Sequence, residues 1–140
     1  MEQAQEGPRR SVEALLPLTP AVFQIMLSIA DSERHGYSIL REVERNTDGQ
    51  VKLGPTTLYR SIRQMLAAGL IEETEERPDP ALDDERRHYY RLTTFGRQVA
   101  LAEMRRLEWL VAMARATSLG GQPGGLGFAA SGSPGRGGGE

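Results

Sequence analysis

The chain has 140 residues, with 17 lysines and arginines, 19 aspartates and glutamates, and no cysteine. This length allows one domain, and the longest apolar runs fall far short of the roughly 18 residues that a membrane span needs. The lack of cysteine excludes disulfides, thiolate metal sites and cysteine nucleophiles, and it predicts a reducing, cytoplasmic location. No basic segment followed by an apolar run opens the chain, so no secretory signal is expected.

The two ends of the chain differ in composition from its middle. Ten of the 16 glycines lie in residues 119–140, which hold few apolar side chains. Such a segment cannot bury enough surface to offset the entropy of ordering, so a disordered tail is predicted. Residues 1–17 are expected to form a partly disordered arm. The folded part then divides into residues 18–93 and a final helix over residues 94–118.

The first predicted helix begins at Thr19 and Pro20. Threonine can cap free amides, and proline at the first helical position loses no hydrogen bond. Its buried stripe is expected to contain four apolar residues at helical spacing, which are Phe23, Met26, Leu27 and Ala30. The polar residues 31–36 are expected to end this helix without forming an element of their own.

Two more helices are predicted before residue 70. One covers about residues 37–46, and its end is marked by the turn residues Asp48 and Gly49. The other opens at Gly54–Pro55 and closes at Gly69. The inward side chains are predicted to be Ile39, Leu40 and Val43 in the former, and Leu58, Ile62, Met65 and Leu66 in the latter.

Two segments of strand composition follow, and then a long helix. The strands are Leu70–Arg77 and Arg87–Thr93, and the loop between them is Pro78–Glu85, which predicts an antiparallel hairpin. Thr93 or Thr94 is expected to cap the last helix. The order predicts a mainly α fold with a small β-hairpin: a winged helix-turn-helix domain followed by a long C-terminal helix that forms a dimer.

Charge is segregated along the chain. Residues 51–71 hold three bases and no acid, residues 72–85 hold eight acids and one base, and residues 86–101 hold four arginines and no acid. Two basic segments on either side of an acidic one indicate a surface that faces a polyanion. A salt-bridged protein surface is the alternative.

The last helix carries a heptad-like seam. Its members alternate in spacing by four and three residues: Ala100, Met104, Leu107, Val111 and Ala114. The spacing predicts an interface with a second copy of the chain, and a single broad core face is the alternative. Trp109, the only tryptophan, lies off this seam. It could line a cavity between two copies and stack a planar ligand, or simply pack.

The segment from Leu18 to Ala116 resembles the PadR family of bacterial transcriptional regulators. Five short pieces carry the resemblance in order: residues 35–40 (HGYSIL), 54–62 (GPTTLYRSI), 68–71 (AGLI), 86–93 (RRHYYRLT) and 94–97 (TFGR). The resemblance implies a homodimeric DNA-binding repressor that pairs through its C-terminal helix and is not an enzyme. Some members of the family sense small aromatic compounds, so such an effector is an expectation here. No cofactor, metal or membrane partner is expected.

The residues themselves agree with a DNA interface. Free amides at Gly54–Pro55 suit phosphate, and outward arginines can read guanine in the major groove. Tyr59 is expected to hold its ring at the core edge and its hydroxyl on a phosphate, with a plain core aromatic as the alternative. The candidate DNA contacts are Tyr37, Pro55, Thr56, Thr57, Tyr59, Arg60, Arg63, Arg86, Arg87 and His88.

The hairpin admits two interpretations. Its basic residues, with Arg91, could lie along a phosphate backbone, or they could neutralise the acids Glu73, Glu75 and Glu76 on the first strand. The acidic segment from Glu72 to Glu85 favours a winged-helix protein–protein module without DNA binding. The acid-free third helix favours a DNA-binding regulator, whose operator would be pseudo-palindromic.

Overall fold

The computed structural model describes residues 12–74, 77–78 and 86–121, and for residues 77–78 and 86–87 only the strand they belong to. The described residues form two compact units, one ending at Glu103 and the other beginning at Met104. The expected tail beyond residue 121, most of the expected arm and the acidic loop lie outside the described residues. Among those residues, no helix is long and apolar enough to cross a bilayer.

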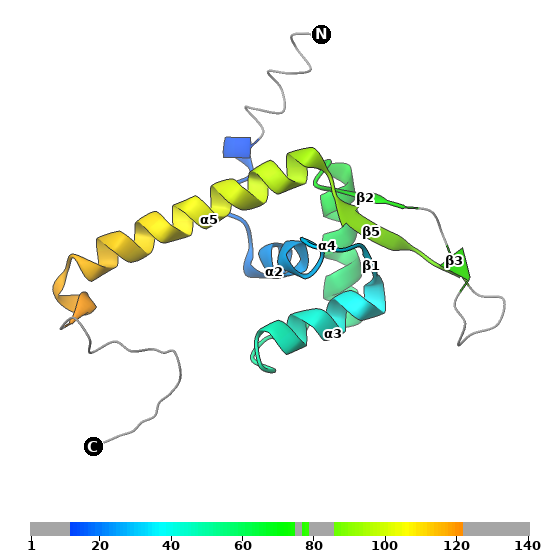
Figure 1. The fold of residues 1–140 in the computed structure, drawn as a ribbon, viewed down its shortest axis with the longest axis horizontal. Helices are drawn as coiled ribbons and strands as arrows, with labels where there is room; N and C mark the ends of the chain where they lie inside the picture. Colours follow the sequence, from blue (N-terminus) through cyan, green and yellow to red (C-terminus); the bar gives the residue numbers. More distant parts are fainter. Residues whose placement is uncertain (1–11, 75–76, 79–85, 122–140) are drawn as a thin grey trace, which may run out of the picture. The chain divides into compact units, whose positions relative to one another are not determined.

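The first unit contains three short helices, α2 (Pro20–Ser28), α3 (Gly36–Asn46) and α4 (Pro55–Ala67). They pack against one another in pairs (Figure 1). The expected start of α2 is confirmed, because the Thr19 side chain accepts a hydrogen bond from the Val22 amide at 3.2 Å. The predicted turn after α3 is confirmed by the left-handed backbone of Asp48 (φ 53°) and Gly49 (φ 80°).

The prediction for the buried stripe of α2 was wrong. Leu27 is 45% exposed, whereas Ile25 and Ile29 are buried together with Met26. A helix of nine residues allows two apolar stripes at similar spacing, and the sequence alone does not say which of them faces α3 and α4. The stripes predicted for the other two helices hold: Ile39, Val43, Leu58, Ile62 and Met65 are all buried.

The sheet is larger than the predicted hairpin. Strands β2 (Ile71–Glu73) and β5 (Tyr89–Leu92) pair antiparallel, and the segment expected to be irregular contributes β1 (Arg34–His35). The strand order is β1-β5-β2, with Arg34 opposite Tyr90. A second, separate pair joins β3 (Arg77–Pro78) to β4 (Arg86–Arg87), so Pro78 lies in a strand and not in the loop. A two-residue strand carries no alternation that periodicity could detect.

The last helix, α5 (Thr94–Arg115), is followed by a short 3-10 turn, η1 (Ser118–Gly120). Residues 94–103 belong to the first unit, where Val99 is buried in the core and Phe95 and Ala100 pack against it. In the arm, Val12, Leu15 and Leu16 pack on the same core. The buried carboxylate of Glu103 accepts a hydrogen bond from the Leu18 amide at 3.4 Å, which ties this arm to α5.

The start of α5 is locked to the sheet by a threonine and a glycine. The Thr93 hydroxyl donates to the Gly69 carbonyl at 2.6 Å and accepts from the Gly96 amide at 2.8 Å, which makes it the predicted cap. Gly96 lies so close to β2 that an added Cβ would stand 1.9 Å from the Leu70 carbonyl oxygen. Only glycine fits there, because backbone atoms cannot move aside as a flexible side chain can.

Gly96→Ala should therefore lower the free energy of unfolding by at least about 1–3 kcal/mol, the usual effect of overpacking a tight site. Gln98→Ala, at an exposed position of the same helix, should change it by no more than about 0.5 kcal/mol. Urea denaturation followed by circular dichroism measures both. Equal stabilities for the two variants would contradict the proposed close contact.

Candidate nucleic-acid interface

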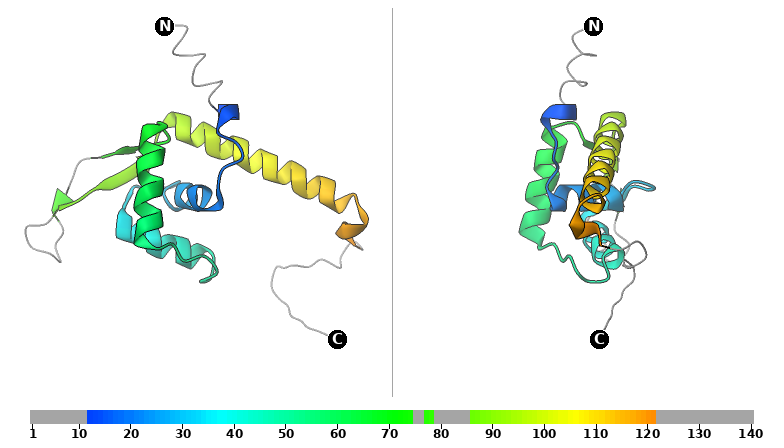
Figure 2. Two further views of the ribbon diagram at one scale, coloured as in Figure 1. Left: turned by 180° about the vertical axis from the view of Figure 1, so that it is seen from behind. Right: turned by 90° about the vertical axis from the view of Figure 1, so that its left-hand side faces the viewer.

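Burial of one stripe fixes which face of α4 is exposed. Leu58, Ile62 and Met65 are buried in the core, so the opposite side of the helix carries the polar residues. Four residues at spacings of four, three and four form one exposed row along the helix: Thr56, Arg60, Arg63 and Ala67. Seen from behind, no other described helix or strand crosses in front of α4 (Figure 2). We refer to this row as the α4 face.

The first turn of α4 has free amides. Gly54 is the N-cap residue and provides no side-chain hydrogen bond, and Pro55 occupies the first helical position. The amides of Thr56 and Thr57 therefore point out of the helix without a side-chain cap. The positive end of the helix dipole and two hydroxyls at the same place suit a phosphate group.

Tyr59 connects the α4 face to the start of α3. Its side chain is 44% exposed, so the alternative of a plain core aromatic was wrong. Its hydroxyl end lies against Gly36, where an added Cβ would stand 2.4 Å from the Tyr59 oxygen. The glycine of the HGY segment thus lets α3 begin beside the second turn of α4.

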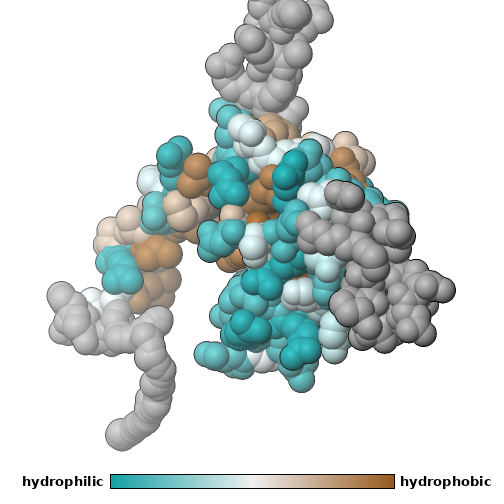
Figure 3. All heavy atoms as spheres, turned by 45° about the vertical axis from the view of Figure 1, so that its right-hand side comes forward, coloured by the Kyte–Doolittle hydropathy of each residue, from teal (hydrophilic) through white to brown (hydrophobic). Residues whose placement is uncertain are grey.

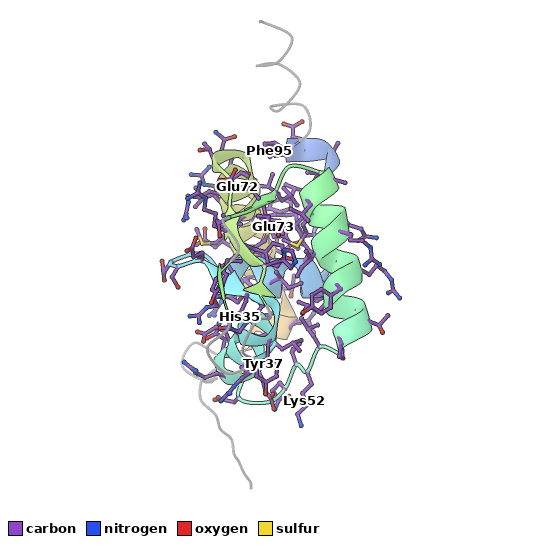
Figure 4. All side chains as sticks on the ribbon, turned by 90° about the vertical axis from the view of Figure 1, so that its right-hand side faces the viewer. His35, Tyr37, Lys52, Glu72, Glu73 and Phe95 are labelled. Carbon is purple, nitrogen blue, oxygen red and sulfur yellow. The ribbon has the colours of Figure 1, made fainter. Side chains whose placement is uncertain are left out.

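His35 and Tyr37 flank this glycine and have different roles. His35 caps α3 by accepting a hydrogen bond from the Ser38 amide on Nδ1 at 3.2 Å, and its ring meets the Tyr89 ring edge to face at 5.3 Å between centroids. Tyr37 is 53% exposed, and the Arg41 guanidinium lies 5.7 Å from its ring centre. Figure 4 shows Tyr37 and Lys52 at one end of the fold and Glu72 and Glu73 on the sheet toward the other end.

Arginines of the first unit differ in their partners. Arg34 donates to the Ser28 carbonyl at 2.7 Å and to the Ser38 hydroxyl at 3.2 Å, and it lies 3.5 Å from Glu42. It therefore joins the end of α2 to α3. By contrast, neither Arg60 nor Arg63 has an ion-pair partner among the residues that the structure describes. The sequence pattern predicted that Arg60 and Arg63 face outward. No feature of the sequence indicated that Arg34 joins α2 to α3.

We refer to strands β2 to β5 as the wing. On the wing, basic residues contact acidic ones. The Arg91 Nε donates to Glu72 Oε2 at 2.7 Å, and His88 Nδ1 contacts the Glu73 carboxylate. The neutralising alternative thus holds for His88, whose partner is the expected Glu73, whereas Arg91 is paired with Glu72, which was not among the expected acids. Arg86 and Arg87 lie in β4, and their side chains are outside the described residues.

Tyr90 is the titratable residue of the sheet with a clear pKa shift. Burial raises its pKa above the usual 10.0, and the nearby Glu73 carboxylate and Tyr59 raise it further. A phenol in this setting stays neutral to a higher pH than in the unfolded chain. The stability linked to Tyr90 is therefore fully present below about pH 10 and is lost as the pH rises through the higher pKa of the folded state.

The fold and the exposed basic face together define a winged-helix DNA-binding regulator. The family model "Transcriptional regulator PadR-like family" matches residues 25–102, just over half of the chain. The chain therefore belongs to the PadR-like family of transcriptional regulators. This confirms the resemblance and the predicted winged helix-turn-helix fold, and it confirms the expectation of a transcriptional regulator and not an enzyme.

Solved structures support the same fold. A transcriptional regulator from Clostridium thermocellum has 21% identity and a TM-score of 0.58, with 68% of this chain and 86% of that chain covered. A PadR family transcription regulator from Clostridium difficile has 18% identity and a TM-score of 0.59, with 69% and 96% covered. RosR from H. salinarum has 24% identity and a TM-score of 0.52, with 74% and 83% covered. A comparison with curated proteins gave no match.

The raised pKa of Tyr90 can be tested by alkaline titration of the folded protein. Wild-type absorbance should show a tyrosine ionisation above the usual value, because the phenolate would be buried beside a carboxylate. Tyr90→Phe should lack this last ionisation step, the one at the highest pH. The free energy of unfolding of the variant should also fall less steeply above pH 10. An unchanged last step in Tyr90→Phe would show that another tyrosine is responsible.

Proposed function

We propose that the chain is a homodimeric repressor that reads an inverted-repeat operator with the α4 face. The observation that carries this proposal is the exposed pair Arg60 and Arg63, on a helix without acidic residues and without ion-pair partners among the described residues. Arginine reads guanine through two hydrogen bonds in the major groove, and both donors must be free to do so.

The surroundings of the α4 face supply contacts to the DNA backbone. The amides and hydroxyls of Thr56 and Thr57, next to Pro55, bind one phosphate at the start of α4. Tyr59, whose hydroxyl lies against Gly36, and the exposed Tyr37 at the start of α3 contact the same DNA strand, so that α3 crosses the backbone. Further phosphates are met by the wing residues Arg86, Arg87 and His88.

The proposed dimer rests on the apolar side chains of α5. Met104 and Val111 of the seam are exposed, and so are four further apolar residues on this helix: Leu101, Trp109, Leu110 and Met113. Figure 3 shows apolar side chains gathered along the second half of α5. This is more apolar surface than a single chain normally leaves in water, and pairing with a second copy covers it. Of the proposed seam, Ala100 also packs on the core and Leu107 is partly buried.

An effector site is part of the same proposal. Trp109 is 62% exposed, so its side chain is not packed in the core of its own chain as the alternative interpretation expected. A cavity between two paired α5 helices would place its indole against a planar aromatic ligand, which it could bind by stacking.

Arg60→Ala and Arg63→Ala should each weaken operator binding by about 1–3 kcal/mol, because each removes a bidentate contact to a base. Both variants should keep wild-type stability, since neither side chain touches the core. Gel shifts on the region upstream of the chain's own gene measure the affinity. Gln24→Ala, on α2, serves as the control and should bind as the wild type does.

The salt dependence separates DNA binding from the protein–protein alternative. Each phosphate that the protein neutralises should contribute about −0.9 to the slope of log affinity against log salt. A flat salt response, or unchanged operator affinity in the double variant Arg60→Ala/Arg63→Ala, would refute the assignment of the α4 face.

Leu107→Glu should give a monomer, or an unfolded chain, that no longer binds the operator, because it puts a charge into the apolar seam. Ala112→Glu adds the same charge on the opposite side of α5 and should leave the dimer intact. Light scattering measures the mass, and circular dichroism shows whether the variant folds. In the dimer, the two half-sites should lie about 10 base pairs apart or a multiple of this distance.

The result that contradicts the dimer is simple to recognise. A wild-type chain that is monomeric at micromolar concentration, and that still binds its operator, would refute both the dimer and the proposed Trp109 cavity.

A further inference from the structure

The cations of the wing and of the α4 face differ in whether a carboxylate is paired with them. In β5, Arg91 stands directly opposite Glu72 of β2, and its Nε donates to Glu72 Oε2 at 2.7 Å. Both side chains are exposed, with 59% and 48% of their surface in water. On α4, Arg60 and Arg63 have no carboxylate within ion-pair distance among the described residues.

A cation that already has a carboxylate partner offers little to DNA. The electrostatic affinity of a protein for DNA comes from charges that replace condensed counterions on the phosphates. The pair of Arg91 and Glu72 has no net charge, so Arg91 neutralises a phosphate only if it separates from Glu72. If the pair stays together, the Glu72 carboxylate is brought toward the negative backbone along with the arginine.

We infer that Glu72 is an internal competitor of the DNA phosphates for Arg91, and that it holds down the contribution of the wing to DNA affinity. The exchange is easy because both partners are exposed and solvent screens the pair. The inference deepens the proposed function and rests on DNA lying along the wing as well as on the α4 face. The wing then adjusts affinity, while the α4 face provides sequence recognition.

The test is a double-mutant cycle on Glu72 and Arg91. Glu72→Gln keeps the shape of the side chain, removes its charge and frees Arg91 for a phosphate. Affinity for a fluorescent duplex carrying the upstream region should rise about threefold at low salt, and the salt slope should steepen by about 0.9. Arg91→Ala alone should bind more weakly than the wild type, because it leaves the Glu72 carboxylate unpaired beside the DNA, whereas the double variant should bind nearly as the wild type does, because the pair contributes little net charge.

The second arm of the cycle separates competition from simple repulsion. In the background of Arg91→Ala, Glu72→Gln should relieve repulsion but should not steepen the salt slope, because no arginine is released to replace a counterion on a phosphate. An equal gain with an equally steeper salt slope in this background would overturn the inference, since it would mean that the change does not depend on Arg91. Glu13→Gln changes the net charge by the same amount outside the wing and should leave the affinity unchanged; an equal gain there would also overturn it.

The two proposals fail in different ways. If Glu72→Gln has wild-type affinity and slope while Arg60→Ala binds less tightly, the competition at the wing is refuted and the α4 face stands. If the wild-type chain binds no duplex from the upstream region, both are refuted. A competing function for Glu72 in folding would appear as a lower unfolding midpoint of Glu72→Gln, which circular dichroism measures in the same samples.

Discussion

The burial of Leu58, Ile62 and Met65 is the constraint on which the proposed DNA interface depends. The rotation of a helix about its own axis decides which side chains face the core. Three side chains held in a close-packed core fix this rotation to within a few degrees. Once this stripe faces inward, Arg60 and Arg63 must face outward. The contact between Tyr59 and Gly36 then fixes the distance between α4 and the beginning of α3. The residues proposed for recognition and for backbone contacts are thereby held in one geometry by packing, before any DNA is present.

The distribution of charge explains how a chain with a net charge of −2 can belong to a DNA-binding family. DNA responds to local potential, and screening limits this response to about 8–10 Å at physiological salt. Acidic residues therefore weaken binding only where they lie beside the interface. On α4 there are none, whereas on β2 Glu72 and Glu73 each meet a basic residue of the facing strand or of its start. Among the residues that the structure describes, the cations of the α4 face are thus unpaired, whereas Arg91 and His88 of the wing are paired with acids.

Most helices and their ends could be predicted because local chemistry determines them. Thr19, Gly54 and Thr93 end up at the helix starts where their side chains or backbones suit capping, and the stripe of α4 follows from spacing alone. The failures have a different origin. Whether Ile25 or Leu27 faced inward, and whether residues 34–35 joined the sheet, depended on neighbours distant in sequence. The role of Gly96 is also tertiary, because the Leu70 carbonyl that excludes a side chain belongs to the turn before β2, far from Gly96 in the sequence.

The proposed dimer follows from the periodicity of α5 taken together with its burial. In residues 94–103 the core receives one side of the helix, through Val99 and Glu103. Leu110 lies seven residues after Glu103 on this side and Ala114 four residues further on, and both are exposed, as are the neighbouring seam residues Met104 and Val111. Selection for one folded chain gives no reason to keep an apolar stripe after the core has ended, and exposed apolar surface costs solubility. A two-fold pairing supplies the reason, since it buries the same stripe from both copies and repeats the α4 face at a fixed distance along DNA. In the proposed dimer, the spacing of the operator half-sites depends on α5, whereas their sequence depends on α4.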